Sequence, residues 1–323
     1  MGMTRYLARR LLEIIPVILA IVVFNFVLIH VAPGDPAQMM AGEMANQEYV
    51  QEIRMRYGLD KPIYVQLALY LANILRGDLG YSIPRGQPVL FLILEKIPAT
   101  LLLVISAQVF SVIFGTMIGV LSARNYGSRK DALICFSSLV LYSTPVFWFG
   151  LILILVFGVG LRIFPIFGMT AAEKGLTGFA YLGDLIWHAF LPVMTLSLAG
   201  LAPMFLRLAR SSILEVMKED FITTARAKGL TENVVFFKHA LRNALLPTVT
   251  QAGFALGFVF SGAVMTETVF AWPGLGRFMM DTAFQRDYPL LMGMFLFISV
   301  AVVAASLITD IVYSVLDPRV VYK

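Results

Sequence analysis

The sequence predicts an all-helical integral membrane protein with six membrane-spanning helices. Of its 323 residues, 59% are hydrophobic and only 14% are charged, and the mean hydropathy is +0.82. A soluble chain of this length needs far more polar surface. Six apolar stretches approach or exceed the roughly 20 residues that a helix needs to cross about 30 Å of hydrocarbon. They are residues 11–32, 100–123, 132–158, 185–206, 246–270 and 290–316. These runs are continuous rather than alternating, which favours helices over barrel strands.

The distribution of basic residues predicts that both termini are cytoplasmic. With the N-terminus inside, the four inner segments hold 15 Lys and Arg in 64 residues, and the outer segments hold 10 in 112 residues. Basic residues concentrate on the cytoplasmic side of membrane proteins, although a long loop such as 33–99 crosses regardless of its charge. We therefore interpret the net charge of +5 as a signal for orientation. A nucleic-acid surface is the weaker interpretation.

The first apolar stretch follows a basic N-terminus, so a signal peptide is the alternative to a retained span. The stretch is longer than a typical signal-peptide core, and Val31-Ala-Pro33 is a poor cleavage site. We therefore predict a retained first helix within residues 1–32. The single Cys135 lies in the third stretch, where it has no disulfide partner within the chain and is expected to be a small core residue.

Residues 33–99 are predicted to form a small helical structure on the outer side of the membrane. Asn46 is placed to cap a helix that ends before Gly58. Lys61-Pro62 then opens a second helix, which closes at Gly77. A five-helix core over residues 100–316 and a cytoplasmic tail over 317–323 complete the predicted organisation.

Small residues recur every four positions in two of the apolar stretches. Gly115 and Gly119 form one pair, and Gly253, Gly257 and Ser261 form a second series. Such faces let helix backbones approach closely. Packing within the bundle is the favoured interpretation, and contact with another membrane subunit or a conduit face is the alternative. Pro145, Pro192 and Pro203 predict local kinks in the third and fourth stretches.

The longest inner loop, residues 207–245, predicts two short helices around a glycine. Residues 213–228 contain no Gly or Pro, and Leu214, Met217, Phe221 and Ala225 follow one another at helical spacing as an apolar stripe. Gly229 is well placed to end that helix at positive φ. Thr231 is placed to cap the next helix. Two amphipathic helices lying on lipid headgroups would show the same pattern, so the residues alone leave both interpretations open.

The loop resembles the cytoplasmic loop of the membrane subunits of binding-protein-dependent ABC importers. That pattern is Glu-Ala-Ala, three residues, Gly, nine residues and Ile-x-Leu-Pro. Aligned on Gly229, this chain has Thr223-Thr-Ala225 and His239-Ala-Leu-Arg242, and it departs from the pattern at the Glu, the first Ala, the Ile and the Pro. These departures are similar to the dipeptide, oligopeptide and nickel permease branch. The lost Glu leaves the role of that position unassigned.

Further strings that are similar to this branch follow in register with the six stretches. They are Tyr57-Gly-Leu-Asp-Lys-Pro62, Gly77-Asp-Leu-Gly-Tyr-Ser82, Ser143-Thr-Pro-Val-Phe147, Glu267-Thr-Val-Phe-Ala-Trp-Pro-Gly-Leu-Gly276 and Arg286-Asp-Tyr-Pro289. The start of the first stretch, Tyr6-Leu-Ala-Arg-Arg-Leu-Leu, resembles the first of the two permeases in such systems. The resemblance covers nearly the whole chain and implies a type I ABC importer permease in a bacterial or archaeal inner membrane.

The resemblance also implies partners. These are a second homologous permease, two cytoplasmic ATPases, an extracytoplasmic solute-binding protein and a peptide-like substrate in a lipid bilayer. The chain contains no Gly-Lys dipeptide and hence no phosphate-binding Walker A loop, so ATP and Mg²⁺ are expected in the partner ATPases and no cofactor is expected here. No nucleic-acid partner is expected. The residues implied to contact the ATPase are Asp220, Thr223, Thr224, Ala225, Arg226, Ala227, Lys228 and Gly229.

Other classes of function are less well supported by the residues. An ion-gradient-driven transporter would show paired halves and ionisable groups at midspan, and neither is recognisable. A membrane enzyme would need a catalytic set, and the three dispersed His residues do not suggest a metal site. Glu267 and Asp310 lie near span ends, where structural capping and inter-subunit pairing are both open. Asp287 is expected to cap the last helix. The transported solute and the substrate-binding residues stay open.

Overall fold

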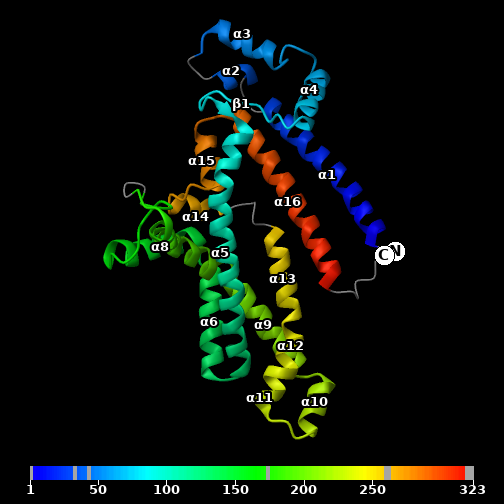
Figure 1. Ribbon diagram of the computed structural model, residues 1–323, viewed down its shortest axis with the longest axis vertical. Coiled ribbons are helices and arrows are strands. Elements are labelled where there is room, and N and C mark those ends of the chain that lie inside the picture. Colours follow the sequence, from blue (N-terminus) through cyan, green and yellow to red (C-terminus); the bar gives the residue numbers. More distant parts are fainter. Residues whose placement is uncertain (1–2, 32–34, 42–44, 172–174, 258–262, 317–323) are drawn as a thin grey trace. The chain divides into compact units, whose positions relative to one another are not determined.

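The computed structural model is mostly helical in the residues that it describes, as the apolar runs predict (Figure 1). It describes residues 3–31, 35–41, 45–171, 175–257 and 263–316. These residues fold as two compact units. Of the described residues, the first unit contains those within 3–100, 263–264 and 274–316, and the second contains those within 101–257 and 265–273. The long helix α5 (Val89–Arg124) passes from the first unit into the second.

The first unit combines the N-terminal third of the chain with its C-terminal helices. Its elements are α1 (Met3–Val31), α2 (Pro36–Ala41), α3 (Gln47–Arg56), α4 (Ile63–Leu75), β1 (Tyr81–Ser82), β2 (Gln87–Pro88), the start of α5, α15 (Leu275–Phe284) and α16 (Tyr288–Leu316). Helices α1 and α16 contact each other along the unit. The two strands form a two-residue antiparallel hairpin in which Tyr81 is opposite Pro88.

The helices predicted within residues 33–99 are confirmed. The side chain of Asn46 accepts a hydrogen bond from the Tyr49 N–H at 2.9 Å, which caps α3. Gly58 and Gly77 follow α3 and α4 at φ of +66° and +78°, in the left-handed region that favours glycine. Whether this segment lies outside the membrane stays a prediction.

The core of the first unit joins the start of α5 to the C-terminal helices. Six buried apolar residues form it, namely Val89, Leu92, Ile93, Leu275, Leu290 and Met294. The Leu275 N–H donates to the Thr100 hydroxyl at 2.7 Å. Asp287 is buried, and its carboxylate accepts hydrogen bonds from the Ser82 hydroxyl and from the Leu290 N–H, so it caps α16 as predicted.

The second unit contains the rest of α5 and the polar loop. Its further elements are α6 (Arg129–Ser143), α7 (Val146–Leu153), η1 (Ile154–Gly160), α8 (Gly178–Leu196), η3 (Ser197–Leu201), α9 (Ala202–Val216), α10 (Asp220–Ala227), α11 (Glu232–Val234), η4 (Val235–Ala240), α12 (Leu241–Ala244), α13 (Leu246–Gly257) and α14 (Val264–Val269). The segments η1, η3 and η4 are π-helical.

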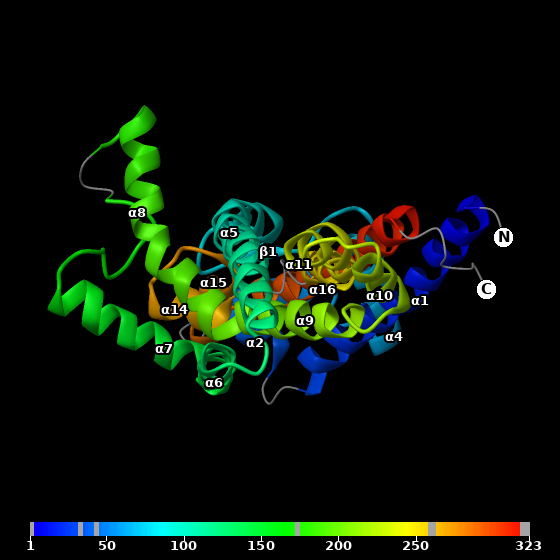
Figure 2. The same ribbon diagram turned by 90° about the horizontal axis from the view of Figure 1, so that it is seen from below.

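The kink predicted at Pro145 is a sharp bend between α6 and α7. The axes of residues 129–143 and 146–160 differ by 104°, and Figure 2 shows α7 turning away from α6. Thr144, directly before the proline, has extended backbone with φ −80° and ψ 127°. The proline ring disfavours helical backbone at the preceding residue, which explains why α6 ends here.

Three described helices are long and apolar enough to cross a membrane, and the bent pair 129–143 with 146–160 would make a fourth. The three are Val89–Arg124, Gly178–Val216 and Tyr288–Leu307. The predicted first span corresponds to α1, in which the apolar part Leu12–Val27 is shorter. The predicted fifth span includes residues 258–262, which lie outside the described residues, as does the tail 317–323. A count of six spans therefore stays a prediction.

Candidate functional site

The candidate site is the loop 207–245, in which the helix predicted over residues 213–228 is interrupted. Helix α9 ends at Val216 and α10 begins at Asp220, so the prediction of an unbroken helix is wrong. Residues 217–219 form a turn in which the Glu219 N–H donates to the Val216 carbonyl at 3.1 Å. Glu219 then takes extended backbone, with φ −72° and ψ 150°. This turn lets α10 fold back onto the segment that follows it.

Helix α10 is held against η4 by a small apolar cluster. Ile222 and Ala225 are buried in α10, and Val235 and Ala240 are buried opposite them in η4. The predicted stripe is wrong at one position: Phe221 is 41% exposed, and its neighbour Ile222 is 0% exposed. Its other members, Leu214, Met217 and Ala225, pack in the apolar clusters of this loop. The break after Val216 changes the rotation of α10, which brings Ile222 inward in place of Phe221.

Gly229 ends α10 as the sequence predicts. Its φ is +80°, and its N–H donates to the Arg226 carbonyl at 2.9 Å. A side chain at Gly229 would meet no atom within 4 Å, so the glycine is required by backbone conformation rather than by space. Thr231 occupies the predicted N-cap position of α11, but its hydroxyl makes no capping hydrogen bond.

An ion pair crosses the turn at Gly229. Arg226 donates to both carboxylate oxygens of Glu232, at 2.8 and 3.2 Å. The hydrogen bonds from Arg226 hold the pKa of the Glu232 carboxyl below its ordinary value of 4.5. Both side chains are exposed to solvent, so the pair orients the turn more than it stabilises the fold.

Most residues that the resemblance assigns to ATPase contact lie on the exposed surface of this segment. Seven are exposed, namely Asp220, Thr223, Thr224, Arg226, Ala227, Lys228 and Gly229. Ala225 is the exception, because it is 5% exposed and faces η4. Its small side chain therefore allows close packing within the loop. Thr224 donates its hydroxyl to the Asp220 carbonyl at 3.0 Å, and Lys228 adds an exposed cation two residues after Arg226.

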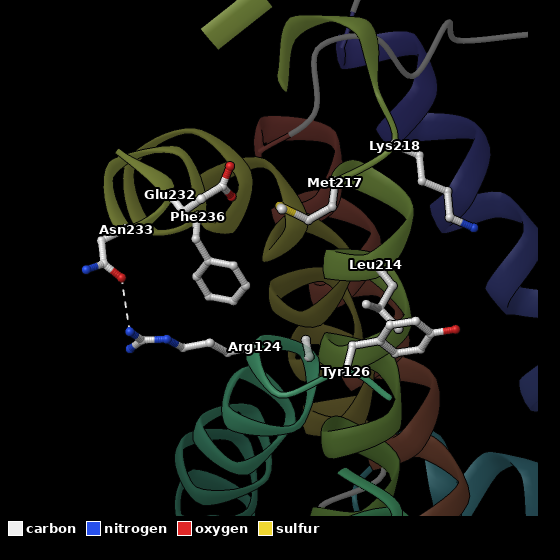
Figure 3. Close-up of a pocket in the computed structure, with 9 residues that line it drawn as sticks. Arg124, Tyr126, Leu214, Met217, Lys218, Glu232, Asn233 and Phe236 are labelled. Carbon is white, nitrogen blue, oxygen red and sulfur yellow. Dashed lines mark hydrogen bonds between the residues drawn. The ribbon is translucent and has the colours of Figure 1, made fainter. Parts of the chain in front are cut away.

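A groove lies beside α11, between the end of α5 and the end of α9 (Figure 3). It encloses about 560 Å³ and is lined by Arg124, Tyr126, Lys218, Asn233 and Phe236, among others. Arg124 crosses its edge and donates to the Asn233 side-chain oxygen at 3.0 Å. The basic residues within 124–131 indicate only the orientation of the chain, and nothing in their pattern indicates that Arg124 contacts Asn233.

The two series of small residues behave differently. An added Cβ at Gly115 would lie 2.5 Å from the Ala202 carbonyl oxygen, and one at Gly119 would lie 2.5 Å from that of Leu206. These glycines let α5 pack directly on α9, which supports the interpretation of packing within the bundle. An added Cβ at Gly253 would meet no atom within 4 Å. Gly257 ends α13, and Ser261 lies outside the described residues.

The remaining ionisable candidates show no shared chemistry. Glu267 is fully buried in α14, while Asp310 belongs to α16, in a stretch whose side chains are not described. Asp184 and His188 form a pair one turn apart in α8, with the His188 Nδ1 3.5 Å from the Asp184 carboxylate. Among the described residues, no three His, Cys, Asp or Glu side chains are grouped as metal ligands would be.

Helices that are long and apolar enough to cross a membrane, together with a packed polar loop that contains a short exposed helix, define an integral membrane protein. Comparison with known families agrees. Residues 115–322 match the binding-protein-dependent transport system inner membrane component, and residues 3–104 match the N-terminal region of such membrane components. The chain therefore belongs to the family of binding-protein-dependent transport system inner membrane components.

Similar proteins align over their full length. The oligopeptide transport system permease protein AppB of Bacillus subtilis is 42% identical over 321 residues, which cover 99% of this chain and all of the relative. The dipeptide transport system permease protein DppB of Escherichia coli K12 is 38% identical, with the same two coverages. The glutathione transport system permease protein GsiC of Escherichia coli O6:H1 is 37% identical, also over 99% of this chain and all of the relative. The chain is accordingly a membrane permease of the ABC importer type.

Proposed function

We propose that this chain is one of two permeases in an ATP-driven importer of di- and oligopeptides. Two cytoplasmic ATPases, a second permease and an extracytoplasmic solute-binding protein would complete the system. Full-length similarity to permeases named for oligopeptide, dipeptide and glutathione transport supports peptides as the cargo class. In this proposal the chain has six spans with both termini in the cytoplasm, and residues 33–99 lie on the outer side.

The observation that carries the proposal is the exposed surface of α10 and its turn. A polar helix of eight residues, with one face packed on η4 and the other in solvent, presents Thr223, Thr224, Ala227 and Lys228 to a partner. ATP-driven closure of the ATPases would move α10 and switch the spans between inward- and outward-open states. Such a shift requires the ATPases to bind both states and to fit one better.

The test is Gly229→Val, with Gly77→Val as its matched control. Both glycines follow a helix at nearly the same φ (+80° and +78°), both donate to the carbonyl three residues earlier at 2.9 Å, and neither has an atom within 4 Å of an added Cβ. A β-branched residue in this conformation costs roughly 1–2 kcal/mol at each position. The strain is thus matched, and only the location differs.

We expect Gly229→Val to stop ATP-dependent peptide uptake in proteoliposomes containing all subunits, while the chain stays in the membrane. Gly77→Val should retain most of the uptake. Equal loss in both variants, or full uptake by Gly229→Val, would contradict a role of this turn in ATPase contact. Uptake that continues without the ATPases and follows an ion gradient would favour the alternative, a secondary transporter. A screen of dipeptides, longer peptides, glutathione and nickel for stimulated ATP hydrolysis assigns the solute.

A further inference from the structure

Residues 122–131, which comprise the end of α5, the turn that follows it and the start of α6, surround a buried carboxylate with donors. Asp131 is 5% exposed. Its two oxygens accept from the Ser122 hydroxyl, from the Gly127 N–H at 3.2 Å and from two nitrogens of Arg210. The Cys135 thiol lies 3.5 Å from the same carboxylate. Side chains on α5, α6 and α9 and the intervening backbone therefore converge on one group.

Arg210 attaches this carboxylate to the helix that leads into α10. It lies on α9, which ends at Val216, and its Nε and Nη2 donate to Oδ1 and Oδ2 of Asp131 at 2.8 Å each. A two-point Arg–carboxylate pair fixes the relative orientation of both groups as well as their distance. The Tyr126 ring, 5.4 Å from the guanidinium carbon, covers the same side chain.

Residues 122–131 also contact the segments that follow α10 in the sequence, α11 and η4. Arg124 donates to Asn233 in α11 at 3.0 Å (Figure 3). Its guanidinium carbon lies 5.3 Å from the centre of the Phe237 ring in η4. Beneath these polar contacts, Ala123, Ile213, Phe236 and Ala244 form one buried apolar cluster. The segments before and after α10 are thus both fastened to residues 122–131.

We propose that residues 122–131 form a brace for α10, and that Asp131 is the positioning residue that makes movement of α10 productive for transport. This inference rests on the proposed function. Helix α10 is joined to its neighbours through the turns at 217–219 and 229–231, which would bend if α10 were pushed. Because the brace holds α9 and η4 together, a push on α10 displaces α5, α6 and α9 as one body.

The first test measures whether the brace and α10 move together. Spin labels are placed at Lys130→Cys and Lys228→Cys, both exposed positions, in a Cys135→Ser background that keeps a donor to Asp131, and the complete complex is compared without nucleotide and with trapped ATP. We expect one narrow distance distribution that is the same in both states. Asp131→Asn should broaden it or make it depend on nucleotide. A distance that changes with ATP in the parent, or that Asp131→Asn leaves unaltered, would overturn the brace.

The second test measures coupling. In Asp131→Asn the amide presents donors to Arg210 and Gly127, and in Arg210→Lys the charge remains but the two-point contact is lost. For both variants we expect the ratio of peptide imported to ATP hydrolysed to fall by about tenfold, the factor expected when one charge-assisted hydrogen bond is lost. Asp281→Asn, which removes an exposed pair with Arg277, should leave the ratio unchanged.

Parallel loss of uptake and ATP hydrolysis at an unchanged ratio would mean that Asp131 is merely structural, and would overturn the proposal. If the complex with Asp131→Asn does not assemble, the ratio of peptide imported to ATP hydrolysed by Arg210→Lys tests the proposal instead. Failure of the proposed function is recognised separately, because the unmodified complex would then bind no ATPases or show no ATP-dependent uptake.

Discussion

At the scale of single residues, glycine serves two separate purposes in this chain. Gly115 and Gly119 are needed for space, because each lies against a carbonyl oxygen of α9. Gly229 is needed for backbone conformation, because its φ is positive and the space around it is open. The two requirements predict different responses to alanine. Alanine at positions 115 and 119 meets a backbone atom that does not move aside, whereas at position 229 it meets only conformational strain.

We expect Gly115→Ala to destabilise the second unit and Gly253→Ala to leave it unchanged or slightly more stable. The Cβ introduced at position 115 would lie 2.5 Å from the Ala202 oxygen, and overpacking of this kind costs about 1–3 kcal/mol. At position 253 the Cβ has free space, and alanine favours a helix by up to about 1 kcal/mol over glycine. Thermal unfolding of the purified protein in detergent measures both. Equal melting temperatures would show that α5 and α9 are not in direct contact.

The Arg226–Glu232 pair predicts a pH dependence that is local to the turn. Because Arg226 lowers the pKa of Glu232 in the folded chain, the pair contributes fully above the ordinary value of 4.5 and is lost as the pH falls through the folded value. Hydrogen exchange of residues 226–232 should accelerate by about twofold on acidification, since exposed pairs are weak. Glu232→Gln at pH 7 should match the unmodified chain at low pH. Exchange that does not depend on pH, after correction for intrinsic rates, would contradict the pairing.

At the scale of elements, the sequence predicted local features well and helix rotation poorly. Asn46, Pro145, Gly229 and Asp287 act as predicted, because caps, proline bends and positive-φ glycines depend on the residue and its immediate neighbours. The break at 217–219 has no local signal, since it contains neither Gly nor Pro. It follows from the burial of Ile222 against η4, a contact between separate elements.

Substitution of two neighbouring residues, Ile222 and Phe221, tests which face of α10 packs on η4. Ile222→Ala should loosen α10 from η4, because truncation of a buried isoleucine costs about 2–5 kcal/mol. Phe221→Ala should change stability little, because the ring is 41% exposed. Limited proteolysis within residues 217–231 measures the loosening, and ATP-stimulated uptake measures its consequence. Rapid cleavage of Phe221→Ala together with protection of Ile222→Ala would restore the originally predicted stripe.

At the scale of the whole molecule, sequence strings that are distant along the chain meet within one unit. Ser82 closes the string Gly77–Ser82, and its hydroxyl bonds to Asp287 of the string Arg286–Pro289, 205 residues later. Arg85 adds a contact of 3.3 Å to Asp287 and lies 4.7 Å from the centre of the Phe278 ring. Neither string alone indicates the other as its partner. The resemblance identified both, but only the structure assigns them to a common buried contact.

The orientation of the chain is the remaining prediction at this scale, and the single native cysteine makes it simple to test. In a Cys135→Ala background, one cysteine is placed at Arg76, the exposed residue directly after α4, and another at Lys228, the exposed residue directly after α10. We expect a membrane-impermeant maleimide to label position 76 in intact cells and position 228 only after permeabilisation. The reason is that the denser basic segments, 207–245 included, are retained in the cytoplasm. Labelling of both positions in intact cells would show that they lie on the same side of the membrane, separated by an even number of spans. That result would overturn the six-span topology. Labelling of position 228 alone would invert it and remove α10 from the side where ATP is available.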